Sequence, residues 1–151
     1  MQSIPQRPSN AFIGAAWVAL IVGCVAFLIG LYNATIPIHE KGYYVTVLLY
    51  GLFSAVSLQK AVRDQAEAIP VTAVYVGLCW TSVLIVIVFM SAGLWNATLT
   101  LSEKGFYGMA FTLSLFAAIT VQKNTRDCAV SDRVATLQTT THDYALGDLN
   151  S

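Results

Sequence analysis

The stretch that decides the fold is GLYNATIPIHEKGYY at residues 30–44, because the chain repeats it as GLWNATLTLSEKGFY at residues 93–107. With an offset of 63 residues, the two halves also match outside this phrase, most clearly in a downstream QKxxRD run. Charged and aromatic positions match as well as apolar ones, so shared apolar composition does not explain the likeness. An internal match of this kind indicates a duplicated structural unit.

The composition places both units in a membrane. The chain is 56% hydrophobic and 11% charged, whereas an ordinary soluble domain is about 25% charged. A bilayer core of about 30 Å needs about 20 helical residues, and about 17 to 25 are tolerated. Four uncharged runs meet this requirement, the second and fourth with help from flanking lysines that reach toward the headgroups. They span residues 11–32, 42–58, 68–102 and 105–121.

These runs predict an all-α membrane protein with four transmembrane helices, arranged as two tandem helical hairpins. Each unit holds an even number of spans, so both copies enter the membrane from the same side and are related by an axis along the membrane normal. We expect a cytoplasmic N-terminal segment at 1–10, repeats at 11–67 and 74–127, and a linker at 68–73. Residues 128–151 are polar without sustained periodicity, which predicts a disordered cytoplasmic tail.

The orientation follows from the Lys and Arg residues near the helix ends, since cytoplasmic loops carry an excess of them. One side of the membrane has only Lys41 and Lys104. We therefore expect both termini and the linker in the cytoplasm, with the repeated phrase forming two outer corners. The cations on the cytoplasmic side are Arg7, Lys60, Arg63, Lys123, Arg126 and Arg133.

The two outer corners supply the candidate binding residues. An Asn at a helix end can satisfy free carbonyls and tolerates a left-handed turn. A Glu beside a helix start is favoured by the helix dipole, and a Lys offers a cation to lipid phosphate. We also expect Ser102 to cap the last helix. The candidate lipid- or partner-binding residues are Asn33, Glu40, Lys41, Asn96, Glu103 and Lys104.

Two interpretations of these corners remain open, a purely structural turn and a binding surface for lipid headgroups or a partner. The structural interpretation is favoured. It predicts that replacing Glu40 and Glu103 by Gln lowers thermal stability modestly and additively. A binding surface predicts normal folding and loss of a bound partner in the double variant.

The inner ends of the second and fourth helices carry QKAVRD and QKNTRD. Their cations suit the negative C-terminal end of a helix, and Arg63 and Glu67 have the i,i+4 spacing of an ion pair. We interpret the repeated polar residues as the cytoplasmic boundary. They are Gln59, Lys60, Arg63, Asp64, Gln122, Lys123, Arg126 and Asp127.

Small residues predict where the helices pack, because they let two backbones approach closely in a membrane. The first helix has such a stripe at Ala15, Ala19, Gly23, Ala26 and Gly30. The fourth helix offers a similar face at Ala110, Ser114 and Ala118.

No residue pattern predicts catalysis or a cofactor. The three cysteines lack the spacing of a disulfide framework or a zinc site. Neither a Ser/His/Asp or Cys/His arrangement nor an HExxH motif is present. The uncharged runs also lack the ionisable group that coupled transport places within the membrane. We therefore expect no catalytic, cofactor-binding or metal-binding residues, and a protein that is not an enzyme.

In these motifs the chain resembles the YiaA/YiaB family of bacterial inner-membrane proteins, built from the YiaAB two-helix domain. The shared elements are G-L-[YW]-N-A-T, E-K-G-[YF]-Y and Q-K-x-x-R-D, each present twice between residues 12 and 127. The resemblance is to the four-span type with two domain copies, and it implies a multi-pass location in the bacterial inner membrane. It implies no activity, substrate or catalytic residue.

The function that we favour is a non-enzymatic structural or interaction component, with envelope homeostasis or stress as its setting. The alternative is a small oligomeric transporter or a passive channel. The expected partners are membrane lipid, a second copy of the chain in a homo-oligomer, and an unidentified protein, but not nucleic acid.

Overall fold

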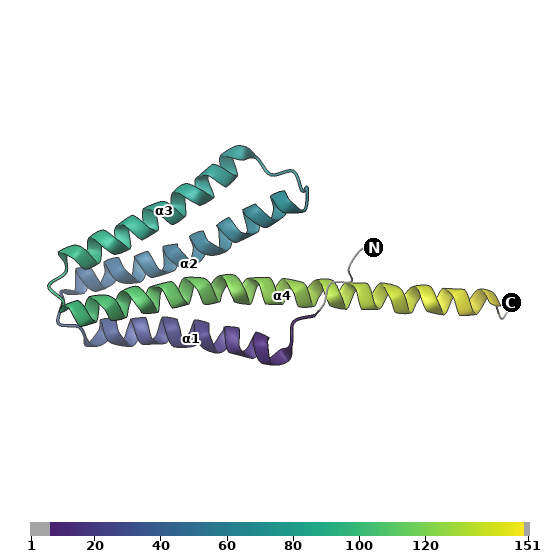
Figure 1. The fold of residues 1–151 in the computed structure, drawn as a ribbon, viewed down its shortest axis with the longest axis horizontal. Helices are drawn as coiled ribbons and strands as arrows, with labels where there is room; N and C mark the ends of the chain where they lie inside the picture. Colours follow the sequence, from purple (N-terminus) through teal and green to yellow (C-terminus); the bar gives the residue numbers. More distant parts are fainter. Residues whose placement is uncertain (1–6, 150–151) are drawn as a thin grey trace.

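The computed structural model of the chain describes residues 7–149, and the side chains of residues 7–140. Within this range it contains the helices α1 (Asn10–Asn33), α2 (Ile38–Ala66), α3 (Ala73–Asn96) and α4 (Leu101–Leu149) (Figure 1). Each is long and apolar enough to cross a membrane. The predicted all-α fold with four transmembrane helices is confirmed. Residues 1–6 and 150–151, parts of the expected N-terminal segment and tail, lie outside the described residues.

Short extended segments connect the two helices of each repeat. Ala34 leaves α1 with φ −64° and ψ 142°, and Ala97 leaves α3 with φ −66° and ψ 144°. The left-handed turn that asparagine tolerates is not used at these ends. Among residues 7–149 the only positive φ belongs to Ala68, at 56°, where the chain turns after α2. Figure 1 shows that both extended connections lie at one end of the molecule and that the α2–α3 linker lies at the other.

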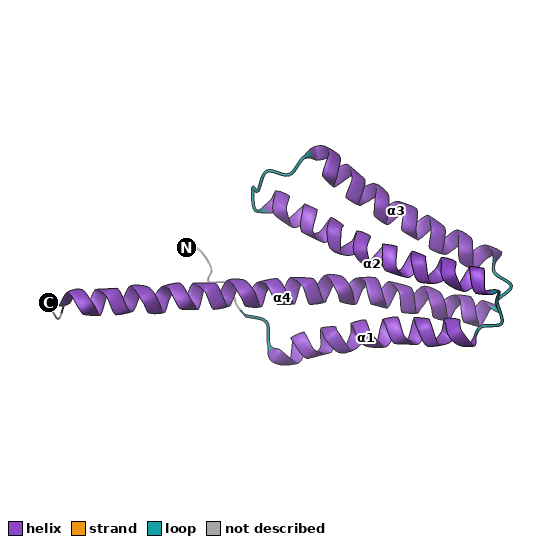
Figure 2. Cartoon of the chain, turned by 180° about the vertical axis from the view of Figure 1, so that it is seen from behind, coloured by secondary structure: helices purple, strands orange, loops and turns teal. Residues whose placement is uncertain are grey.

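The helices that follow one another within a repeat are not the ones that pack along one another. α1 packs along α4 and α2 along α3, whereas α1 touches α2, and α3 touches α4, only sparsely. α2 also contacts α4, so these two helices form the centre of the bundle (Figure 1, Figure 2). The two repeats therefore interleave around a pseudo-twofold axis between α2 and α4.

α1 and α3 lie at the periphery of this arrangement. In each of them 17% of the spanning window is buried, against 33% for α2 and 39% for α4. Their outward faces carry exposed aliphatic side chains, such as Val18 and Ile21 on α1 and Leu84 and Val88 on α3. Apolar surface of this kind is suited to lipid rather than water.

The close approach of α1 and α4 depends on small residues. A Cβ atom on Gly23 would lie 2.6 Å from Oγ of Ser114 and 3.1 Å from its backbone nitrogen, so glycine is required there. All three small residues predicted to pack on α4 are buried. The stripe predicted on α1 needs one correction, because Ala15 is exposed and Ala16 is buried in its place. Ala16, Gly23 and Gly30 recur every seven residues, which keeps them on one side of a coiled helix.

α4 continues far past the expected membrane boundary, which corrects the predicted disorder of the tail. The helix runs from Leu101 to Leu149, a length of 49 residues. No Pro or Gly interrupts residues 109–146, and extending an existing helix avoids the unfavourable nucleation step. The hydroxyls of Thr136, Thr139 and Thr140 donate to carbonyls four residues back, so these polar side chains are satisfied within the helix.

Candidate functional site at the outer corner

The two copies of the repeated phrase are packed into each other at the end of the bundle that holds both extended connections, which is the predicted outer end (Figure 1). A Cβ atom on Gly30 would lie 2.7 Å from Cε1 of Phe106 and 3.3 Å from Cε1 of Tyr107. Gly93 stands in the same relation to the aromatic pair at residues 43–44, at the same two distances of 2.7 and 3.3 Å. The glycine of each phrase therefore makes room for the aromatic pair of the other.

A tyrosine pair marks the point where the two repeats meet. The rings of Tyr44 and Tyr107 stack with centroids 6.3 Å apart and an interplanar angle of 17°. Only 3% and 4% of these residues are exposed. Each ring also meets its chain neighbour edge to face, Tyr43 at 5.4 Å and Phe106 at 5.5 Å. Because the stacked tyrosines are equivalent in the two repeats, the pseudo-twofold axis passes between them.

The asparagines and lysines of the corners donate hydrogen bonds to backbone carbonyls near the ends of α1 and α3. Asn33 and Asn96 each donate from Nδ2 to the carbonyl four residues back, at 2.9 and 2.8 Å. Lys41 and Lys104 each donate from Nζ to the carbonyl nine residues back, at 2.8 and 3.3 Å. Only the carbonyls reached by the two lysines belong to the last four residues of a helix, which have no partner within it. The lysines therefore cap the ends of α1 and α3, whereas the asparagines bond to carbonyls of the regular helical ladder.

Glu103 caps its own helix. Its Oε2 atom accepts hydrogen bonds from the backbone N–H and the hydroxyl of Thr100, at 2.7 and 2.8 Å, and Thr100 Oγ1 accepts from the N–H of Glu103 at 3.3 Å. This is a capping box of the form Thr-x-x-Glu. The expected cap at Ser102 is wrong, because Ser102 already lies in the first turn of α4 and Thr100 holds the cap position.

Glu40, the counterpart of Glu103, has no such role. Pro37 stands where the second repeat has Thr100, and it gives α2 no side-chain cap. Among residues 7–140 no donor hydrogen-bonds to the Glu40 carboxylate and no cation pairs with it. The two repeated glutamates are therefore not equivalent, since one is used in the fold and the other is free.

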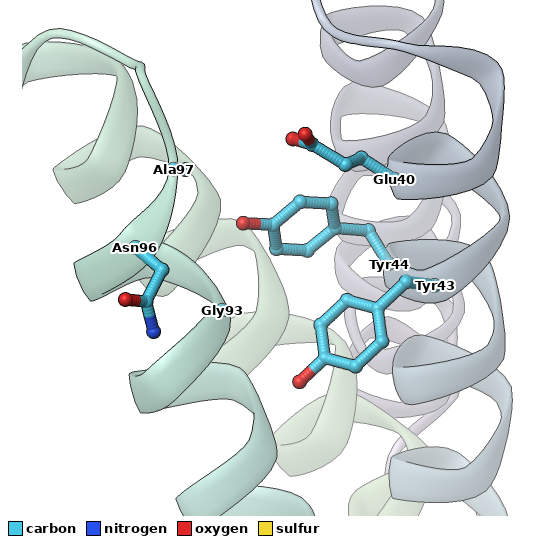
Figure 3. Close-up of a pocket in the computed structure, with 6 residues that line it drawn as sticks. All are labelled: Glu40, Tyr43, Tyr44, Gly93, Asn96 and Ala97. Atoms are coloured by element: carbon cyan, nitrogen blue, oxygen red, sulfur yellow. The ribbon is translucent and has the colours of Figure 1, made fainter.

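Glu40 lines a pocket between the start of α2 and the end of α3 (Figure 3). In Figure 3 the Glu40 carboxylate and the Tyr44 hydroxyl point from α2 toward the end of α3. Tyr43 donates its hydroxyl to the carbonyl of Phe89 at 2.6 Å, which fixes this ring as one wall. The pocket has a volume of 260 Å³ and is lined by Glu40, Tyr43, Tyr44, Gly93, Asn96 and Ala97.

At the inner end of the bundle, Glu67 joins the two repeats. Its carboxylate pairs with Arg126 of α4 and lies 3.6 Å from Arg63 Nε, which confirms the predicted i,i+4 pair. Arg63 also pairs with Asp64 at 2.9 Å. Glu67 has no glutamate counterpart in the second repeat, and for this reason the repeat alignment left it out of the boundary set.

A groove lies in the inner half of the bundle, where the α2–α3 pair leans away from α4 (Figure 1, Figure 2). Apart from Gln59 and Arg63 its lining is apolar, as expected for a surface that faces lipid chains. It has a volume of 520 Å³ and is lined by Ala55, Leu58, Gln59, Val62, Arg63, Ala66, Trp80, Val83, Leu115 and Ile119.

Two stretches of the chain, residues 12–64 and 75–127, match the yiaA/B two helix domain. The matches are offset by the same 63 residues as the internal repeat, and they cover the α1–α2 and α3–α4 hairpins. The chain belongs to this family.

The relatives of this YiaAB protein place it in the membrane. Inner membrane protein YiaA of Escherichia coli (strain K12) is 52% identical over 137 residues, covering 91% of this chain and 94% of that protein. Uncharacterized membrane protein YubF of Bacillus subtilis (strain 168) is 40% identical over 68 residues, covering 44% of this chain and 78% of that protein. No solved structure shows a significant match. With its four apolar helices, the chain is a multi-pass inner-membrane protein.

Within the described part of this YiaAB protein, no group of three or more His, Cys, Asp or Glu side chains is placed to hold a metal ion. Of the predicted corner residues, the structure brings only Glu40 and Asn96 together in one pocket. Sequence reasoning missed Tyr44 and Gly93 as lining residues, because it took only the Asn, Glu and Lys residues of the corners as candidates. The signal was the recurrence of a glycine and an aromatic pair at the same spacing in both phrases.

Proposed function

We propose that this YiaAB protein is a non-enzymatic component of the inner membrane that acts by binding lipid or a protein partner at its outer corner. The observation that carries the proposal is the outer pocket with the free carboxylate of Glu40. The equivalent carboxylate of Glu103 is consumed by a helix cap. The dipole of α2 favours a carboxylate in its first turn, and because no side chain pairs with it, this charge is also available to a ligand.

The chemistry of the spans supports an interaction role over the transporter alternative. Coupled transport uses ionisable groups within the membrane, where such groups are costly and mark ion or proton pathways. The four uncharged runs of this chain contain no Asp, Glu, Lys, Arg or His. The same absence removes the usual general acids, bases and charged electrophilic groups from the interior of the bundle.

We place both termini and the α2–α3 linker in the cytoplasm, because six of the eight Lys and Arg residues lie on that side. Cys128 reports this orientation. An impermeant maleimide should label it in spheroplasts only after permeabilisation, whereas a Cys introduced as Thr98→Cys in a Cys128→Ser background should label without permeabilisation. The reverse pattern would overturn the orientation.

A photo-crosslinking amino acid in native membranes tests the interaction role. Placed at the exposed Thr98 of the outer connection, it should give a discrete adduct with a lipid or one protein. Placed at Val88, on the lipid-facing side of α3, it should give only diffuse lipid adducts. Protein-dependent flux of ions or small solutes in proteoliposomes would replace the proposal by the transporter or channel alternative.

A further inference from the structure

We propose that the outer pocket binds an organic primary ammonium group, the chemistry carried by the headgroup of phosphatidylethanolamine and by small free amines. The inference rests on the proposed interaction role and names the ligand class of the same site. Its basis is the unpaired carboxylate of Glu40, which lies beside tyrosine rings and a hydroxyl acceptor. No cationic side chain lines the pocket.

The polar atoms of the pocket match the donors of an ammonium group. Such a group carries three N–H donors and no acceptor. Glu40 offers a free carboxylate, and Tyr44 offers a hydroxyl oxygen that faces the same side (Figure 3). The Asn96 side chain donates to its own helix and its oxygen is directed away from Glu40 and Tyr44 (Figure 3), so it adds no acceptor to this set. The charge-assisted bond to Glu40 is the stronger of the two.

The α3 side of the pocket also favours positive charge. Gly93, Asn96 and Ala97 lie at the C-terminal end of α3, which is the negative end of the helix dipole. Two tyrosine rings line the opposite wall, and an aromatic face attracts a cation within about 6 Å. The nearby cations are already placed elsewhere, since Lys41 and Lys104 donate to helix-end carbonyls and neither lines the pocket.

The second repeat does not reproduce this set of groups. Glu103 accepts two hydrogen bonds from Thr100, so its carboxylate is not available. Phe106 replaces Tyr43, so the ring lacks the hydroxyl that anchors the wall in the first copy. The structure therefore assigns one ammonium site per chain, between α2 and α3, despite the internal symmetry.

The size and depth of the pocket fit a headgroup. A volume of 260 Å³ holds an ethanolammonium group but not a lipid chain. Tyr32 and Trp95, which are 83% and 86% exposed, mark the membrane–water boundary at the same end of the bundle. Both an outer-leaflet headgroup and an amine in the outer aqueous phase reach this depth.

Native mass spectrometry and thermal unfolding of the full chain in nanodiscs test the inference. The chain should retain one phosphatidylethanolamine in preference to phosphatidylglycerol, and Glu40→Gln should weaken that retention at least about tenfold. Its unfolding temperature without phosphatidylethanolamine should fall by less than that of Glu103→Gln, because Glu40 loses only its interaction with the α2 dipole and no cap. Equal retention by the parent and Glu40→Gln would overturn the site.

Two matched variants separate binding from folding. Glu103→Gln removes the equivalent carboxylate and should lower stability while phosphatidylethanolamine retention stays unchanged. Pro37→Thr rebuilds the Thr-x-x-Glu capping box around Glu40 and should raise stability while weakening retention. If Glu40→Gln proves poorly folded, Pro37→Thr decides, because a stabilised chain with undiminished retention would contradict the proposal.

The source of the ammonium group is decided with two further probes. The first probe is ethanolammonium chloride, added to the chain in phosphatidylglycerol nanodiscs. If it raises the unfolding temperature of the parent but not that of Glu40→Gln, the ligand is a free amine. Selective retention of phosphatidylethanolamine without such a rise assigns the lipid. Retention of phosphatidylcholine as strong as that of phosphatidylethanolamine would overturn a hydrogen-bonded primary ammonium. If the ammonium site is disproved but a protein partner still cross-links at the outer connection, the proposed interaction role remains. If the protein instead carries solute across proteoliposomes, the interaction role is disproved, whereas the ammonium-binding results keep their meaning.

Discussion

Glu40 and Glu103 occupy equivalent positions in the repeated phrase, yet only Glu103 forms a helix cap. The difference arises at the residue three positions earlier, where Thr100 can form a reciprocal cap and Pro37 cannot. A proline has no side-chain acceptor and no N–H to offer to the glutamate. The difference between Pro37 and Thr100 is therefore enough to leave the Glu40 carboxylate without a capping role.

This asymmetry predicts unequal costs for changes at the two corners. Thr100→Ala removes the cap of α4 and should lower the free energy of unfolding by about 0.5–2 kcal/mol. Thr98→Ala is the matched control, because Thr98 is an exposed threonine of the same connection. Unfolding in SDS titrations measures both. Losses of equal size in the two variants would show that the capping box contributes nothing.

Much of the corner could be predicted from sequence, and the part that was missed has a physical reason. Asn33 and Asn96 end their helices as expected, but their side chains bond to the carbonyls four residues back and not to the free carbonyls of the last turn. The capping box at Thr100 is present in the sequence as TLSE, but we expected the cap at Ser102, one residue before the glutamate. The pocket was not predictable, because it forms between helices whose pairing the sequence does not state.

At the scale of the helices, apolar runs and flanking charges predicted where each span lies, but not which span it packs against. In a membrane, apolarity does not select a partner, since lipid is equally apolar. Small residues do select partners, and Gly23 and Ser114 stood in the two predicted stripes. The sequence did not say that these stripes meet each other, and adjacency within a hairpin suggested the wrong neighbours.

Gly23→Ala should weaken the packing of α1 on α4. The added Cβ would lie 3.1 Å from the backbone nitrogen of Ser114, which cannot rotate away as a side chain can. Overpacking of this kind costs about 1–3 kcal/mol. Gly14→Ala is the control on the same helix, because a Cβ there meets nothing within 4 Å, and it should be neutral or slightly stabilising. Comparable destabilisation of both variants would contradict the assigned contact.

Glu67→Gln should loosen the inner ends of α2 and α4, because it removes the carboxylate that pairs with Arg126 and Arg63. Glu67 is 39% exposed in its side chain, so the expected loss is modest, about 0.2–1 kcal/mol. The loss should shrink in high salt, which screens exposed pairs. A control, Asp132→Asn, affects a more exposed pair with Arg7 and should have less effect. A loss independent of salt would point to packing instead of charge.

At the scale of the whole molecule, neither repeat has its packing partners within itself. α1 depends on α4, and α2 depends on α3 and α4. A chain cut in the linker between Ala68 and Ile69 should therefore reassemble when its two halves are made together, and they should purify in equal amounts. The first half alone should self-associate or be degraded. A stable monomer of the first half, with the unfolding temperature of the full chain, would contradict the interleaved arrangement.

The interleaving also constrains how the protein is made. α1 leaves the ribosome first, but α4, on which it packs, is finished only after the rest of the bundle has been synthesised. At about 5–20 residues per second, the roughly one hundred intervening residues take on the order of 5–20 s. For that interval the glycine face of α1 has no native neighbour and must be shielded by the insertion machinery or by lipid. Biogenesis of this protein therefore requires α1 to wait in the membrane until α4 arrives. A ribosome that stalls before α4 leaves behind three helices, of which α1 lacks its packing partner, and quality-control proteases can recognise this fragment.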